Sequence, residues 1–150
     1  RAGGALYNNL DYSFTVEHED GTFEYPATQH GGGTPELRRQ LSYLKSFVKG
    51  FDFLNLTPDS TLLSGDSIVL KNAQVLAEKG KQYAIYIFGK GPHTFDLAAP
   101  AGNYTVEYLN PLTGIFEAQQ KVVSDGKIKF TSPEYTEDLA IKVMRSNSAL

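Results

Sequence analysis

Hydrophobic residues recur at two different spacings along this chain. Between residues 35 and 49, Leu37, Leu41, Leu44 and Val48 recur every three or four positions, with Phe47 beside them. This spacing puts the apolar side chains on one face of a helix. From residue 74 onward apolar and polar residues alternate instead, as in "YTVEY" and "KIKF". Such alternation is typical of β-strands that turn one face to a core and the other to solvent.

The local signals at both ends support a helix from about Pro35 to Lys49. Thr34 is placed to accept a hydrogen bond from a free amide of the first turn, and Pro35 suits the first helical position, where no N–H is needed. Gly50 follows the last apolar residue, and we expect it to adopt the left-handed conformation that often ends a helix.

The alternating part of the chain predicts about seven short strands. Turn signals separate them, including Asp125-Gly126, which predicts a tight hairpin, and Asn110–Gly114, which predicts a type I turn closed by glycine. The spacing is typical of an antiparallel β-sandwich or barrel. The predicted strands are 74–78, 81–88, 93–98, 103–109, 115–123, 127–132 and 139–144.

The chain therefore divides into three regions. Residues 1–53 form a polar, aromatic segment and one helix, residues 54–73 form a connector with at most one short strand, and residues 74–150 form the β-sandwich. One helix without a sheet of its own is an unusual unit. We expect residues 1–53 to be the end of a larger domain, and the predicted fold is mainly β with one leftover α-helix.

Composition excludes several classes of function. The chain has no cysteine, so it has neither disulfides nor thiolate metal sites. Its net charge of −3 and its lack of a Lys/Arg stripe argue against nucleic-acid binding. No apolar run reaches the roughly 18 residues that a membrane-spanning helix needs. We expect neither nucleic acid nor membrane as a partner, and we expect self-association only if the apolar face of the helix is exposed.

The richest chemistry lies between Tyr7 and Pro26, in "YNNLDYSFTVEHEDGTFEYP". Aromatic rings beside amides and carboxylates suit sugar binding, since rings stack on C–H surfaces and polar groups hold hydroxyls. The alternative is a loop whose Asn and Asp side chains satisfy their own turns. The residues of this first group are Tyr7, Asn8, Asn9, Asp11 and Tyr12.

A second group in the same segment is "EHED", residues 17–20. Its carboxylates around His18 could bind a hard cation. However, Asp20-Gly21 also predicts a hairpin turn, with Thr15-Val16 and Thr22-Phe23 as its arms. The turn explains the residues better, and the three histidines lack the spacing of a zinc site. We predict no metal site and no cofactor.

The sandwich could itself bind glycans through aromatic platforms. Its alternation pattern favours core packing for these rings over exposure, and tryptophan is absent. The candidate platform residues are Tyr83, Tyr86, Tyr104, Tyr108 and Phe116.

Several stretches together resemble one bacterial family of glycoside hydrolase-like proteins. They are "GGALYNNLDYSFTVEHEDGTFEYP", "GGGTPELRRQLSYLKSFVKGFDF", "YAIYIFGKG" and "AGNYTVEYLNPLTG". The family has an apiosidase-type (β/α)8 barrel followed by a small β-sandwich that is named for collagen binding. The resemblance implies that residues 1–53 are the last loop and last helix of such a barrel.

The resemblance also implies where function should be sought. Loops at the carboxyl end of barrel strands build the active site, so the first group, with His18 and Glu19, is the candidate substrate-binding set. The two catalytic carboxylates of such barrels lie on earlier strands, so no catalytic residue is assigned to this chain. The expected partner is a carbohydrate bound through the parent barrel, and the expected location is secreted or periplasmic.

Three hypotheses remain open on the sequence. In the first, the chain is the C-terminal part of a glycoside hydrolase, with an accessory sandwich and no activity of its own. In the second, it is an autonomous module that binds a carbohydrate or an extracellular protein. In the third, the sandwich is only a structural brace. An exposed row of tyrosines would favour the second hypothesis, and a buried set would count against it.

Overall fold

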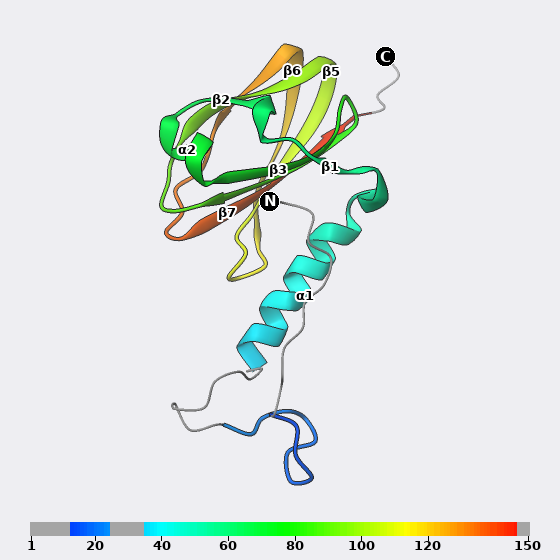
Figure 1. The fold of residues 1–150 in the computed structure, drawn as a ribbon, viewed down its shortest axis with the longest axis vertical. Coiled ribbons are helices and arrows are strands. Elements are labelled where there is room, and N and C mark those ends of the chain that lie inside the picture. Colours follow the sequence, from blue (N-terminus) through cyan, green and yellow to red (C-terminus); the bar gives the residue numbers. More distant parts are fainter. Residues whose placement is uncertain (1–12, 25–34, 147–150) are drawn as a thin grey trace. The chain divides into compact units, whose positions relative to one another are not determined.

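The computed structural model confirms that the chain is mainly β, and its described residues form seven antiparallel strands and two α-helices (Figure 1). It describes residues 13–24 and 35–146. The chain divides between Gly50 and Phe51 into two units, and each is described by itself. In the described residues no helix is long and apolar enough to cross a membrane.

Helix α1 spans Pro35–Lys49, as predicted. Glu36 lies in its first turn and Lys49 in its last, where each charge complements the helix dipole. The expectation for Gly50 was wrong, because this residue is not among the glycines with positive φ. Its N–H bonds to the Phe47 carbonyl at 3.1 Å, so the last turn tightens without a left-handed residue. The predicted cap Thr34 lies outside the described residues.

The second unit is built on one continuous set of strand pairings. The strands pair in the order β1-β3-β4-β7-β5-β2, and β6 pairs with β5. All pairings are antiparallel. The strands are β1 Thr57–Pro58, β2 Leu63–Gly65, β3 Ala73–Glu78, β4 Gln82–Phe88, β5 Thr94–Leu109, β6 Phe116–Thr131 and β7 Asp138–Arg145.

Strands β5 and β6 each span two of the predicted strands. The Asp125-Gly126 hairpin was wrong, because both residues lie inside β6, and the predicted break at 100–102 lies inside β5. The register shifts between Ala99 and Gly102, and β5 then changes partners from β2 to β7. A bent β5–β6 pair therefore runs from one layer of the sandwich into the other, which is how strands form the corners of such folds.

The core lies between these layers. It contains the alternate residues of β4 and β7, for example Ile85 and Ile141, which lie opposite each other and are almost completely buried. Phe95 and Phe130 from the bent pair stack with ring centroids 5.1 Å apart. Burial of these side chains is the main source of stability in this unit.

The predicted connector, residues 54–73, contains more structure than the expected single short strand. It carries β1, β2, two short 3-10 helices at Phe53–Asn55 and Ser60–Leu62, and helix α2 at Ser67–Asn72. Its Leu63 and Val69 are buried in the core of the sandwich.

A turn closed by glycine lies at Asn110–Gly114, as predicted, but it is not a type I turn. Gly114 has a φ of 71° and donates its N–H to the Asn110 carbonyl at 2.9 Å. The Asn110 side chain accepts from the N–H groups of Leu112 and Thr113 at 3.0 and 3.3 Å. The closing bond joins residues four apart, whereas that of a type I turn joins residues three apart. The Asn110 side chain bonds to the backbone N–H groups inside the loop.

Candidate functional site

The predicted sugar-binding set is only partly within the described residues. Tyr7, Asn8, Asn9, Asp11 and Tyr12 lie outside them. His18 and Glu19 lie in the described loop at residues 13–24, where Glu19 is exposed and His18 is half-buried. This loop is therefore the part of the predicted site whose geometry can be described.

The loop folds differently from the predicted hairpin. Thr15 and His18 form a β-bridge with two backbone hydrogen bonds of 3.2 and 3.1 Å, so Val16 and Glu17 form the tight turn. A second turn follows, closed by the Gly21 N–H on the His18 carbonyl at 3.0 Å. The predicted hairpin at Asp20-Gly21 was wrong, because the central residues of this turn are Glu19 and Asp20 and the predicted arms do not pair with each other.

Three polar side chains of this loop, those of His18, Asp20 and Thr22, contact one another. Asp20 accepts from the Thr22 hydroxyl at 2.8 Å and from the Thr22 N–H at 3.2 Å. The His18 Nδ1 lies 3.1 Å from the same hydroxyl. The hydrogen bond from Thr22 holds the pKa of Asp20 below its ordinary value. These contacts favour a self-satisfied loop over a cation site, and the described residues contain no group of three His, Asp or Glu side chains suited to a metal.

Arg38 of α1 holds this loop in place, which the sequence did not reveal. Its guanidinium donates to the Ser13 hydroxyl at 2.9 Å and to the Gly21 carbonyl at 2.6 Å, and it lies 4.9 Å from the centre of the Phe14 ring. A Cβ at Gly21 would come within 2.8 Å of both Arg38 and Phe14. Glycine is therefore needed there for space as well as for its φ of 74°.

A second polar cluster lies inside the sandwich unit. The Asp66 carboxylate accepts from the Ile68 N–H at 2.8 Å, which caps α2, and lies 2.9 Å from the His93 Nδ1. These two contacts, the first the larger, lower the pKa of Asp66. His93 also exchanges hydrogen bonds with Ser132 through its backbone, at 2.9 and 3.0 Å. The contacts of His93 with Asp66 and Ser132 connect α2 to the loops before β5 and after β6.

Three polar atoms near this cluster are buried without a hydrogen-bond partner. They are the His93 Nε2, the Tyr135 hydroxyl and the Asp138 Oδ1. The rings of His93 and Tyr135 meet edge to face, 6.1 Å apart. Burial, with the charges of Asp66 and Asp138, raises the pKa of Tyr135 to about 12. A phenol that keeps its proton to so high a pH cannot act as a base or nucleophile near neutrality.

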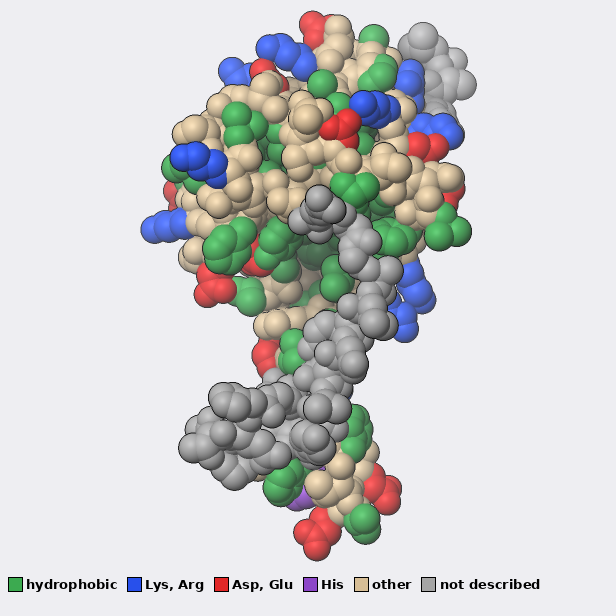
Figure 2. Space-filling view, in the orientation of Figure 1, with side chains coloured by type: hydrophobic (Ala, Val, Ile, Leu, Met, Phe, Trp, Pro, Cys, Tyr) green, Lys and Arg blue, Asp and Glu red, His purple; other side chains and the backbone are tan. Residues whose placement is uncertain are grey.

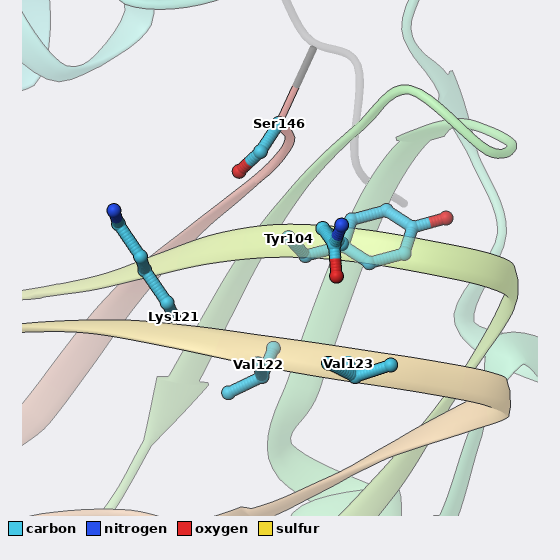
Figure 3. A pocket seen from close by; sticks show the side chains of 6 residues that line it. Tyr104, Lys121, Val122, Val123 and Ser146 are labelled. Atoms are coloured by element: carbon cyan, nitrogen blue, oxygen red, sulfur yellow. The ribbon is translucent and has the colours of Figure 1, made fainter. Parts of the chain in front are cut away.

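A shallow pocket of about 210 Å³ lies where the end of β7 meets β5 and β6 (Figure 3). Val122 and Val123 line it from β6, with Lys121 beside them and Ser146 across from them. The volume is below the range of about 300–1,000 Å³ that is usual for small-molecule sites. We assign it no ligand.

The aromatic residues proposed as platforms divide into two groups. Tyr83, Tyr104 and Tyr108 are buried in the core, as the alternation pattern predicted. Tyr86 is 40% exposed and Phe116 is 50% exposed, so core packing was the wrong expectation for these two. On the face of the sandwich seen in Figure 2, charges of both signs are interspersed, and hydrophobic side chains gather in its lower half.

The fold is similar to parts of two solved glycoside hydrolases. One, described as a glycoside hydrolase, matches with a TM-score of 0.58 and 15% identity, over 86% of this chain and 32% of that chain. The other is the crystal structure of a glycoside hydrolase family 5 protein from Bacteroides vulgatus ATCC 8482. It matches with a TM-score of 0.60 and 15% identity, over 75% of this chain and 25% of that chain.

The chain thus spans about a third of the length of one neighbour and a quarter of the length of the other. No family model matches the chain, and no curated protein matches its sequence. At this identity the likeness shows the fold alone. It agrees with a fragment of a glycoside hydrolase and does not single out the apiosidase-type family.

Proposed function

We propose that this chain is the C-terminal part of a glycoside hydrolase and that its β-sandwich is an accessory domain without catalytic residues. The observation that carries the proposal is the extent of the structural match. Residues 51–150 make up two thirds of the chain, so a match over 86% of it must include residues before Phe51 as well. The neighbour therefore shares the sandwich together with part of what precedes it.

The burial of the tyrosines supports an accessory role over autonomous glycan binding. Glycan-binding sandwiches need exposed aromatic rings, and Tyr83, Tyr104 and Tyr108 are each at most 2% exposed. Tyr86 and Phe116 are the exposed rings of the predicted platform set. The proposal keeps a carbohydrate as the partner, bound through the barrel by residues 7–12 with His18 and Glu19, and a secreted or periplasmic location.

Glycosidase assays test this proposal. The 150-residue chain and the full product of the reading frame that contains it are each incubated with a panel of aryl glycosides. We expect hydrolysis only by the longer protein, because paired carboxylates on earlier strands perform the reaction in such barrels. Hydrolysis by the 150-residue chain would overturn the assignment.

The alternative is an autonomous module that binds a carbohydrate or an extracellular protein such as collagen. The exposed rings of Tyr86 and Phe116 are the observation in its favour. Affinity electrophoresis of the 150-residue chain in polysaccharide gels, and its retention on immobilised collagen, test it. Retention that is lost in a Tyr86→Ala variant would replace the accessory role with this one.

A further inference from the structure

We propose that Arg38 is a positioning residue for carbohydrate binding, because its side chain joins the two ends of the loop that carries His18 and Glu19. This inference rests on the proposed function, in which His18 and Glu19 contact the carbohydrate. It adds the residue that fixes the geometry of these two side chains and the kinetic constant that this residue controls. The loop and α1, which carries Arg38, belong to the same compact unit, Gly4–Gly50.

The Arg38 guanidinium bonds to both ends of the loop at once. Its Nη1 donates to the Ser13 hydroxyl at 2.9 Å, and its Nη2 donates to the Gly21 carbonyl at 2.6 Å. Ser13 is completely buried, and its carbonyl accepts from the Phe23 N–H at 3.2 Å. Because the guanidinium is a rigid planar fork, the directions of its donors fix the separation of the two bonded ends.

Backbone bonds hold the segment between these ends in one shape. Thr15 and His18 bond to each other at 3.2 and 3.1 Å, and the Gly21 N–H bonds to the His18 carbonyl at 3.0 Å. These bonds join residues of the loop to one another. Arg38 connects the turns that they form to α1. The position of His18 and Glu19 relative to the helix therefore depends on Arg38.

The loop leaves two polar groups available to a carbohydrate. Glu19 is exposed, and among the described residues its carboxylate has no hydrogen bond or ion pair. His18 uses its Nδ1 for the Thr22 hydroxyl, at 3.1 Å, which leaves its Nε2 available. The Asp20 carboxylate, by contrast, is already bonded to Thr22. Carboxylate oxygens and imidazole nitrogens form hydrogen bonds with hydroxyl groups, so Glu19 and His18 suit the hydroxyls of a sugar.

A loop that is fixed before binding increases affinity, because ordering it during binding costs free energy. Without Arg38 the two ends of the loop lose their shared partner, and His18 and Glu19 lose their fixed position. In the proposed enzyme the reaction itself is performed by paired carboxylates on earlier strands. Loss of Arg38 should therefore raise KM and leave kcat nearly unchanged, which is the pattern of a residue that contributes to substrate binding alone.

Kinetic measurements on the full product of the reading frame, with its best substrate from the aryl glycoside panel, test this role. Arg38→Ala removes both bonds to the loop, and Arg38→Lys keeps the positive charge but not the planar fork. Ser13→Ala removes one of the two bonds. Arg39→Ala is the matched control, because this neighbouring arginine is exposed and pairs with Glu36 within the helix, at 3.2 Å.

We expect KM to rise about tenfold in Arg38→Ala and Arg38→Lys and by less in Ser13→Ala, with kcat within about twofold of that of the unmodified enzyme. Arg39→Ala should leave both constants unchanged. If Arg38→Ala does not fold, the comparison of Arg38→Lys and Ser13→Ala with Arg39→Ala decides.

Three results would overturn the positioning role while the proposed function stands. They are an unchanged KM in both Arg38 variants, a normal KM in Arg38→Lys alone, and a fall in kcat and melting temperature without a rise in KM. The second result would mean that charge matters and geometry does not, and the third would indicate a purely structural role. A full product that hydrolyses no member of the panel would instead overturn the proposed function, and this inference with it.

Discussion

Tyr83 and Tyr135 are both buried in the sandwich, but their hydroxyl groups have opposite surroundings. The Tyr83 hydroxyl accepts from the Gly80 N–H at 2.7 Å in the turn between β3 and β4. The Tyr135 hydroxyl is buried without a partner. The ring of Tyr83 contributes apolar burial and satisfies a backbone donor, whereas the hydroxyl of Tyr135 has lost its hydration without gaining a bond.

Removal of each hydroxyl should therefore have a different effect on stability. We expect Tyr83→Phe to lower the free energy of unfolding by about 1–2 kcal/mol, because the Gly80 N–H is left unpaired. Tyr135→Phe should leave it unchanged or slightly raised. Urea denaturation followed by circular dichroism measures both. A loss in Tyr135→Phe as large as that in Tyr83→Phe would mean that the Tyr135 hydroxyl has a role that its surroundings do not indicate.

At the scale of elements, the bent β5–β6 pair joins the two layers of the sandwich. Ser124, which is buried, donates from its hydroxyl to the Ala99 carbonyl at 2.7 Å and accepts from the Gly126 N–H at 3.2 Å. These bonds lie where the register of the pair shifts. One serine thus satisfies backbone groups on both strands of the bend.

Ser124→Ala should weaken this bend. We expect a loss of about 1–2 kcal/mol, because a buried carbonyl loses its hydroxyl donor. In a domain of this size, that loss should lower the melting temperature by roughly 4–16 °C. Ser46→Ala on the exposed side of α1 is the matched control and should leave the melting temperature unchanged. Equal melting temperatures for the two variants would contradict the role given to Ser124.

The same elements show what the sequence could and could not predict. The bounds of α1 were predictable because the helical spacing and the Pro35 signal are local. The lengths of β5 and β6 were not predictable, because the residue types that form turns also form bends within a strand. Only the pairing across the sheet distinguishes a turn from a bend. The arrangement of residues 13–24 was hidden for a similar reason, since Arg38 lies 25 residues from its partner Ser13.

At the scale of the whole molecule, ionisable groups set the pH range of stability. Hydrogen bonds from Thr61, Ile68 and Lys81 lower the pKa values of Asp59, Asp66 and Glu78, respectively, below their ordinary 3.8, 3.8 and 4.5. A carboxyl group whose pKa is lowered in the folded chain stabilises the fold at pH values above the ordinary pKa of that group. This contribution is lost as the pH falls through the lowered pKa.

At the basic end of the pH range, the relevant groups have pKa values that are raised in the folded chain. Burial raises the pKa values of Tyr108 and Tyr135, the latter to about 12, and the bond to Asp96 raises that of Lys127 above 10.5. The folded chain holds these protons to a higher pH than the unfolded chain does. Their contribution is complete below about pH 10 and is lost as the pH rises beyond it.

We therefore expect a broad maximum of stability between about pH 5 and pH 10. Melting temperatures measured across the pH range at constant ionic strength check this. The decline on the acid side should begin between pH 4.5 and pH 3.8, the ordinary values of Glu78 and the two aspartates. A decline that began above about pH 6 would contradict the assignment to these three carboxyl groups.

The candidate sugar site also belongs to this scale. Residue types together with the family resemblance suggested Tyr7, Asn8, Asn9, Asp11 and Tyr12, and these lie outside the described residues, so that assignment stays a prediction. For His18 and Glu19, the sequence could not distinguish a sugar-binding role from a loop whose polar groups bond to one another. The contacts of Thr22 with Asp20 and His18 that decide this depend on the folded turn.

The central claim is that this chain is one part of a larger glycoside hydrolase, and the mass of the natural protein tests it most directly. The 150 residues account for 16.5 kDa. The protein isolated from its source, measured intact by mass spectrometry, should be several times heavier. Its peptides N-terminal to Arg1 should include barrel strands that carry two carboxylates. An intact mass near 16.5 kDa would contradict the account and make the sandwich a self-contained module.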